Sequence, residues 1–191
     1  MCNFCGTFVV DLNLCVMKKL FFSLSCLLAV TMALTGCKDS KDEPAIYATH
    51  AEVAYTVLLS CDDVPDCVTN LNEIELTIHY LDADGKEQTK PVKQDGENVT
   101  IKVASFPATY NFYVTGKLID ESKDKYNFGI SIKKSIQLYM NDGSKGSSFY
   151  PAVTGFGSTG IQKDRLVDDY LPKLKDRTVF GGKFNESGGF N

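Results

Sequence analysis

Apolar and polar side chains alternate with a period of two along most of the chain from residue 51 onward. Half-buried strands show this pattern because successive side chains of an extended backbone point to opposite sides. The alternation is cleanest in residues 73–81, where Ile74, Leu76, Ile78 and Tyr80 share the apolar face. It predicts strands at 51–60, 73–81, 86–92, 98–103, 109–119 and 126–140.

Three features modify the strand pattern. Lys134 interrupts the apolar face of 126–140, which predicts a bulge or a bend there. Residues 82–85 (Asp-Ala-Asp-Gly) have the chemistry of a hairpin turn. The strand that follows this turn is polar, so we expect it at a sheet edge.

The C-terminal part follows different patterns. Residues 141–160 are rich in Gly and Ser and predict a long loop. Apolar side chains then recur at helical spacing, which predicts an amphipathic helix over 160–175, begun by a capping box at 159–162 and ended near Leu171 by Pro172. A short strand near 177–184 is expected to close the sheet, and the tail is expected to fray.

Several strands joined by short turns, with one short C-terminal helix, predict a mainly β protein that folds as an antiparallel β-sandwich. We assign this body to residues 50–191. One face of each strand buries apolar side chains and the other meets water.

The first 49 residues indicate export. A basic start at Met17-Lys18-Lys19 precedes an apolar run over 20–33, which is shorter than the ~20 residues of a membrane-spanning helix. We therefore predict a signal peptide at 17–36. Residues 1–16 are expected to be an N-terminal extension from a start codon assigned too early.

Residues 34–37 (Leu-Thr-Gly-Cys) resemble the lipobox of bacterial lipoproteins. The resemblance implies that signal peptidase II cleaves between Gly36 and Cys37 and that Cys37 carries diacylglycerol. Two or three acyl chains hold firmly, because each buried methylene contributes ~0.8 kcal/mol. Residues 37–49 are then a lipidated flexible tether. An ordinary secretory peptide with an incidental cysteine is the alternative.

Acidic residues follow Cys37 closely, at Asp39, Asp42 and Glu43, although lysines interrupt the run. The run resembles the surface-export signal of Bacteroidota lipoproteins. We expect a lipid-anchored outer-membrane location, with the cell surface favoured over the periplasmic face.

The body is also similar to small lipoproteins of Bacteroidota. The matching stretches are 74–80, 82–86, 106–110 and 124–129. This resemblance covers about 50–175 and implies an immunoglobulin-like sandwich. That family is largely uncharacterised, so the resemblance implies no activity.

The charge balance argues against nucleic acid as a partner. Removing residues 1–37 takes away Lys18, Lys19 and Asp11 and leaves 18 basic and 23 acidic side chains, a net charge of −5. Phosphate contact needs clustered Lys and Arg. We expect no nucleic-acid partner and no cofactor.

Two of the seven cysteines, Cys61 and Cys67, lie within the body. An even pair in an exported chain predicts a disulfide; half of a metal site is the alternative. The loop between them carries Asp62, Asp63 and Asp66, which are candidate ligands of a surface calcium ion. A solvated loop is the competing interpretation.

Two other motifs are formal matches only. Residues 155–160 fit G-x-G-x-x-G, but a dinucleotide site also needs a parallel βαβ unit. Residues 82–85 lack the twelfth-position Glu of an EF-hand loop, so we prefer the hairpin turn. The only histidines, His50 and His79, have no nucleophile at fixed spacing, and we expect no enzyme activity.

Exposed aromatic side chains are the remaining candidates for ligand contact. The candidates are Tyr113, Tyr139, Phe149, Tyr150 and Phe156. They could stack on a glycan or anchor a protein partner, or those in the loop could fold back and be buried. We therefore expect a non-enzymatic binding or structural module anchored to the cell envelope. The alternatives are a loop-based hydrolase and a periplasmic envelope-assembly accessory.

Overall fold

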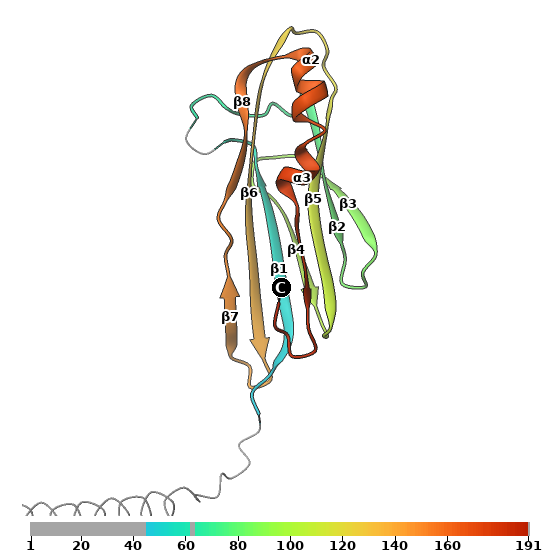
Figure 1. Ribbon diagram of the computed structural model, residues 1–191, viewed down its shortest axis with the longest axis vertical. Helices are drawn as coiled ribbons and strands as arrows, with labels where there is room; N and C mark the ends of the chain where they lie inside the picture. Colours follow the sequence, from blue (N-terminus) through green and yellow to red (C-terminus); the bar gives the residue numbers. More distant parts are fainter. Residues whose placement is uncertain (1–44, 62–63, 191) are drawn as a thin grey trace, which may run out of the picture. The chain divides into compact units, whose positions relative to one another are not determined.

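Nine strands form two antiparallel sheets in the computed structural model, which describes residues 45–61 and 64–190 (Figure 1). The first sheet has the order β4-β1-β6-β7, and β8 also pairs with β6. Its strands are β1 (Ala48–Leu58), β4 (Glu97–Val103), β6 (Lys125–Met140), β7 (Lys145–Phe149) and β8 (Thr154–Gln162). The second sheet has the order β3-β2-β5-β9. Its strands are β2 (Ile74–Leu81), β3 (Glu87–Pro91), β5 (Ala108–Leu118) and β9 (Phe180–Phe184).

The inward faces of the two sheets form one core. Most side chains on the apolar faces are buried in it, for example Val53 and Val57 of β1, Leu76 of β2 and Phe112 of β5, whereas Tyr80 is only partly buried. Complete burial of such a side chain stabilises the fold by about 1.5–3 kcal/mol. The predicted antiparallel β-sandwich is confirmed.

The strand arrangement follows the immunoglobulin pattern, in which sheet A-B-E-D faces sheet C-F-G. Strands β1, β2, β4, β5 and β9 take the places of B, C, E, F and G, and β3 takes the place of C′. The place of strand A beside β1 is filled by β6, which comes later in the chain. The sandwich is therefore immunoglobulin-like with three differences among the described residues: β6 replaces A, β4 has no neighbour in the place of D, and β7 and β8 are added beside β6.

The strand boundaries differ little from the expected ones. Strand β1 begins at Ala48, so the last two residues of the expected tether belong to the sheet. The turn at 82–85 is confirmed: Asp82 Oδ1 accepts hydrogen bonds from the backbone N–H groups of Asp84 and Lys86, and Gly85 supplies a φ of 75°. Strand β3 lies at a sheet edge, as expected.

The prediction of a long loop over 141–160 is wrong, because β7 and β8 occupy most of it. Gly157 fits a close approach of backbones rather than a flexible loop. Gly157 lies opposite Gly129 of β6, and a Cβ atom on either residue would collide with a carbonyl oxygen, that of Phe128 or of Cys67 respectively. Glycine is required where the chain passes this close to another backbone.

The segment 59–69, which we call the disulfide loop, causes this crowding. Cys61 and Cys67 form the predicted disulfide, with Cα atoms 5.5 Å apart. Thr69 Oγ1 donates to Gly129 O and accepts from Gly129 N–H, and Ser131 Oγ donates to Ser60 O. The loop therefore covers the outer face of β6, which explains why β6 is buried on both faces over 128–132.

Lys134 does not mark a bulge against β1, because the register between β1 and β6 is continuous from His50 to Leu58. The other edge of β6 is interrupted instead, where its partner changes from β8 to β7. Lys134 extends between the sheets, 5.8 Å from the ring centroid of Phe180, and its Nζ donates to Val179 O. Burial lowers the pKa of this ammonium group.

The predicted C-terminal helix starts later than expected, its first part ends near Leu171 as predicted, and a further turn follows beyond Pro172. Helical turns run through α2 (Lys163–Arg165), η1 (Leu166–Tyr170) and α3 (Leu174–Thr178), with a break that contains Pro172. There is no capping box: the N-cap is Gln162, which makes no side-chain cap hydrogen bond, because 160–162 continue β8. Leu166 and Leu174 are buried in the core.

The C-terminal tail folds back instead of fraying. Phe190 forms an isolated bridge with Phe184, and its ring lies 5.4 Å from that of Phe149. The side chain of Asn185 accepts hydrogen bonds from the backbone N–H groups of Ser187 and Gly189.

Candidate binding surface

Each sheet carries, on its outer face, one histidine stacked on a tyrosine of the neighbouring strand. His50 of β1 lies opposite Tyr139 of β6, with ring centroids 4.5 Å apart and an interplanar angle of 3°. His79 of β2 lies opposite Tyr113 of β5, with centroids 4.6 Å apart and the same angle. Both histidines of the chain are thus held in the same kind of pair.

The His79–Tyr113 stack forms one wall of a cavity of about 210 Å³ on the second sheet. Polar side chains from β3 and β5 complete most of the rest. The lining residues are His79, Tyr80, Leu81, Glu87, Gln88, Thr89, Asn111 and Tyr113. We call this space the His79 cavity.

Contacts on both sides hold the ring of Tyr113 in place. His79 approaches from β2, and Lys175 Nζ of α3 lies 4.9 Å from the ring centroid. The hydroxyl of Thr115, two residues along β5, lies 2.8 Å from His79 Nε2. Side chains fixed in this way present their polar atoms in a defined geometry.

A second hollow of about 470 Å³ adjoins this stack, between β5 and the helical segment. Thr115 and Lys175, which contact the stack, also line this hollow. Leu118, Val167 and Leu171 give it apolar walls. The polar His79 cavity and this partly apolar hollow therefore lie next to each other along β5.

The His50–Tyr139 stack has different neighbours. Tyr139 Oη donates a 3.0 Å hydrogen bond to Glu52 Oε2, and this bond raises the pKa of Tyr139. His50 Nδ1 lies 3.1 Å from Thr49 Oγ1. The carboxylate of Glu52 thus engages the Tyr139 hydroxyl, the group that a ligand would otherwise contact.

The three aromatic candidates from 141–160 have different environments. Phe156 packs against Tyr170 and under the guanidinium group of Arg177, so this side chain folds back. Phe149 is 42% exposed although it contacts Phe190, and Tyr150 is 70% exposed. Only the last two remain available to a partner.

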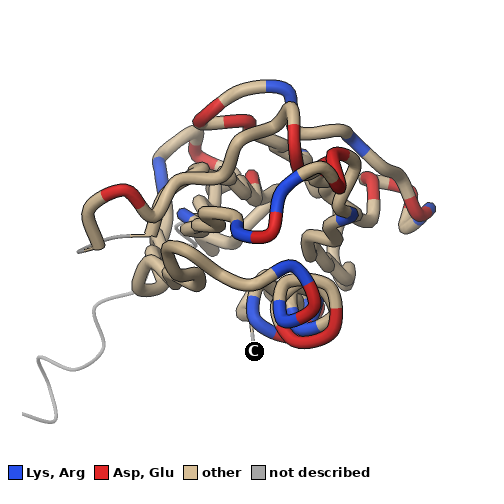
Figure 2. Tube along the Cα trace, turned by 90° about the horizontal axis from the view of Figure 1, so that it is seen from above, with Lys and Arg blue, Asp and Glu red and all other residues tan. Residues whose placement is uncertain are grey.

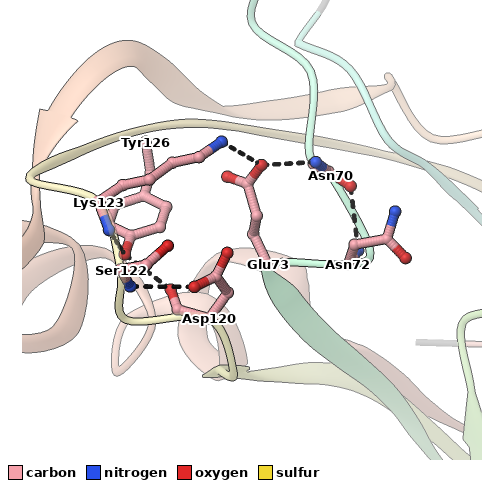
Figure 3. A network of polar contacts seen from close by, with 7 residues as sticks. All are labelled: Asn70, Asn72, Glu73, Asp120, Ser122, Lys123 and Tyr126. Carbon is pink, nitrogen blue, oxygen red and sulfur yellow. Dashed lines mark hydrogen bonds and ion pairs between the residues drawn. The ribbon is translucent and has the colours of Figure 1, made fainter.

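A polar network fastens the loops at the end of the sandwich where β2 begins (Figure 3). Glu73, which the alternation places on the outer face, is only 8% exposed. Its carboxylate accepts hydrogen bonds from Lys123 Nζ at 2.7 Å and from Asn70 Nδ2 at 2.5 Å. This contact raises the pKa of Lys123. The sequence signal that was missed is Asn70, three residues before Glu73.

A hollow of about 520 Å³ lies beside this network and is lined in part by Glu73 and Lys123. Tyr126 Oη donates a 2.7 Å hydrogen bond to Asp120 O, which ties the 119–124 connection to β6. The charged groups here bind one another, so we assign the network to loop positioning.

Positions of lysine and arginine and positions of aspartate and glutamate are intermixed along the backbone when the molecule is viewed from above (Figure 2). The ion pairs Lys163–Glu121 and Lys173–Asp169 belong to this mixture. A mixed surface offers no concentrated field for a polyanion.

The described residues also test the candidate metal and nucleotide sites. Asp66 is exposed with a φ of 64°, whereas Asp62 and Asp63 lie outside the described residues. No group of three or more potential metal ligands occurs within the described ranges. Residues 155–160 lie in antiparallel β8, which is not the strand–turn–helix context of a dinucleotide site.

Gly36, Cys37 and the predicted signal peptide lie outside the described residues. Within 45–61 and 64–190, no helix is long and apolar enough to cross a membrane. No known family model matches the chain. A search of curated proteins also found no match.

Proposed function

We propose that the protein is a lipid-anchored lipoprotein of the outer membrane that acts as a non-enzymatic binding module. The observation that carries this proposal is the Leu-Thr-Gly-Cys sequence at 34–37, placed directly after a basic and apolar leader. Strand β1 begins only a few residues later, at Ala48.

The short sequence separation between Cys37 and β1 supports anchoring as part of the function. Residues 38–47 can span at most about 35 Å when fully extended. A domain on this tether stays close to the membrane surface, where its exposed cavities meet ligands of the envelope. The acidic residues Asp39, Asp42 and Glu43 favour the outer surface.

Metabolic labelling with radioactive palmitate tests the anchor. The wild-type chain is expected to incorporate label and to sediment with membranes, whereas Cys37→Ala loses the label and keeps the uncleaved leader. Cys26→Ala, within the predicted leader, is the matched control and should retain the label. Labelling of Cys37→Ala at the wild-type level, or no labelling of the wild type, would contradict the proposal.

Protease treatment of intact cells tests the favoured leaflet. A surface protein is degraded while a periplasmic control protein stays intact. Protection of the protein until the outer membrane is opened would instead favour the periplasmic assembly role.

A further inference from the structure

We propose that the His79 cavity binds one neutral sugar ring, recognised through its hydroxyl groups. This inference rests on the proposed function, because it takes the domain to be a binding module and names the class of ligand. The cavity itself, its lining and its rigidity carry the argument.

Size restricts the ligand. The cavity holds about 210 Å³, which is below the roughly 300–1,000 Å³ typical of sites for drug-sized ligands. A single six-membered ring is therefore the appropriate scale, and a longer glycan would place one residue here and extend outward.

The lining suits hydroxyl groups, which both donate and accept hydrogen bonds. Asn111 offers an amide donor and acceptor, Thr89 a hydroxyl, and Glu87 a carboxylate acceptor. Leu81 supplies an apolar surface between these groups. A ring with hydroxyls at its rim and C–H groups on its faces matches a polar wall with an apolar patch.

The polar groups are positioned before any ligand arrives, which reduces the entropic cost of binding. Tyr113 is held between His79 and Lys175. Gly181 of β9 lies opposite Asn111, where a Cβ atom would come within 2.8 Å of Asn111 Oδ1. The absence of a side chain at Gly181 therefore leaves room for the side-chain amide of Asn111.

Tyr113 contributes its hydroxyl and ring edge rather than an open face. His79 contacts the Tyr113 ring from β2, the neighbour of β5 on one side. Lys175 contacts the ring from α3. This helix lies at the opposite edge of β5, where Val114 N–H donates a hydrogen bond to Thr178 Oγ1. Recognition in this cavity thus depends on hydrogen bonds, and removal of Asn111 should weaken it strongly.

Charge favours a neutral ligand over an acidic one. Glu87 lies in the lining. None of the residues that line the cavity is a lysine or an arginine, and the ammonium group of Lys175 lies over the ring of Tyr113. A carboxylate or sulfate on the sugar would face the Glu87 side chain without a dedicated cation.

The two histidines provide a site-specific test. In the full chain, extracted in detergent and purified with a tag that lacks histidine, ring-selective NMR should resolve one signal set for His79 and one for His50. Variants His79→Gln and His50→Gln assign them. Glucose, galactose, mannose and N-acetylglucosamine are titrated, with galacturonate as the acidic comparison.

We expect at least one neutral sugar to shift the His79 signals saturably while the His50 signals stay in place. Asn111→Ala should weaken that binding by about tenfold, the effect of losing one well-placed hydrogen-bonding group. Asn111→Asp, which keeps the side-chain shape, is the second variant should the first fail to fold. Tyr139→Phe is the control and should bind as wild type does.

Three results would overturn the inference: no neutral sugar shifts the His79 signals, both histidines shift equally, or only galacturonate binds. Palmitate labelling of the same preparation separates this outcome from the proposed function. A labelled protein without sugar binding contradicts the cavity assignment alone, whereas an unlabelled protein that binds sugar contradicts the anchor alone.

Discussion

The two outer faces of the sandwich carry the same pair of side chains in different surroundings. On the first sheet, the Tyr139 hydroxyl donates a hydrogen bond to the Glu52 carboxylate, so the polar end of this stack is already paired within the protein. On the second sheet, the stack of His79 and Tyr113 borders a cavity. The comparison shows that the same histidine–tyrosine pair occurs both in a hydrogen-bonded setting and beside a cavity, and we infer that only the second setting leaves room for a ligand.

The faces also differ in their cover. The disulfide loop lies over the outer face of β6 and is joined to it through Thr69 and Ser131. The second sheet keeps its outer face open around the His79 cavity. Substitutions on the two faces should therefore affect different properties, stability on the first and binding on the second.

Gly129→Ala should give the largest effect, because its Cβ would collide with the backbone of Cys67. We expect a loss of about 3 kcal/mol in the free energy of unfolding, the upper range for overpacking. Lys117→Ala, on an exposed position of β5, is the control and should stay within about 0.5 kcal/mol of wild type. Urea unfolding measures both. Equal stability of the two variants would contradict the conclusion that the disulfide loop packs closely over the outer face of β6.

Removing the disulfide should have the next largest effect. Cys61→Ser combined with Cys67→Ser opens a loop whose closure stabilises by about 2 kcal/mol on the chain-entropy estimate. Addition of reductant to the wild type should reproduce the loss in thermal unfolding, while the double variant does not respond. An unchanged midpoint would show that the loop is held by its hydrogen bonds alone.

Tyr55→Phe tests how the helical segment joins the first sheet. Tyr55 Oη donates a 2.8 Å hydrogen bond to Thr178 O, so its removal should cost about 1 kcal/mol near pH 7. Burial raises the pKa of Tyr55 above its ordinary value of 10.0. Because the unfolded chain then loses its proton first, the wild type loses stability as pH rises above 10, whereas the variant lacks this loss. The difference between them should narrow in alkaline solution; a constant difference would contradict the assignment.

The smallest effect is expected at the His50–Tyr139 stack. Glu52→Gln removes the carboxylate that raises the pKa of Tyr139, so this pKa should fall toward its ordinary value. Ultraviolet titration of tyrosine ionisation measures the change, with Tyr139→Phe identifying the signal. Sugar binding at the His79 cavity should be unaffected. A change in sugar binding would show that the two outer faces are coupled.

The alternation of side chains was sufficient to predict β1, β2, β4 and β5, because each of these strands has one buried face and one more exposed face. The edge strand β3 has no buried face and followed from the turn before it, and β6 alternates only outside 128–132. The alternation failed for β7 and β8. Gly157 is small because it approaches Gly129 and the disulfide loop, a contact between segments far apart in sequence. The Gly- and Ser-rich composition of 141–160 therefore led to the wrong prediction of a loop where β7 and β8 lie.

The site was predicted only in part. The outward parity of Tyr113 and Tyr139 singled them out, but their histidine partners depend on cross-strand register, which the alternation does not give. Glu73 was assigned to the outer face, yet Lys123, brought close by folding, and Asn70 bury it in an ion-paired network. Such contacts follow from tertiary packing and not from local pattern.

Intact-mass measurement of the protein extracted from membranes tests the central claim most directly. The account predicts a chain that begins at Cys37 and carries the added mass of acyl groups on that residue. A membrane-extracted product with an unmodified Cys37, or one that still includes residues 17–36, would contradict it.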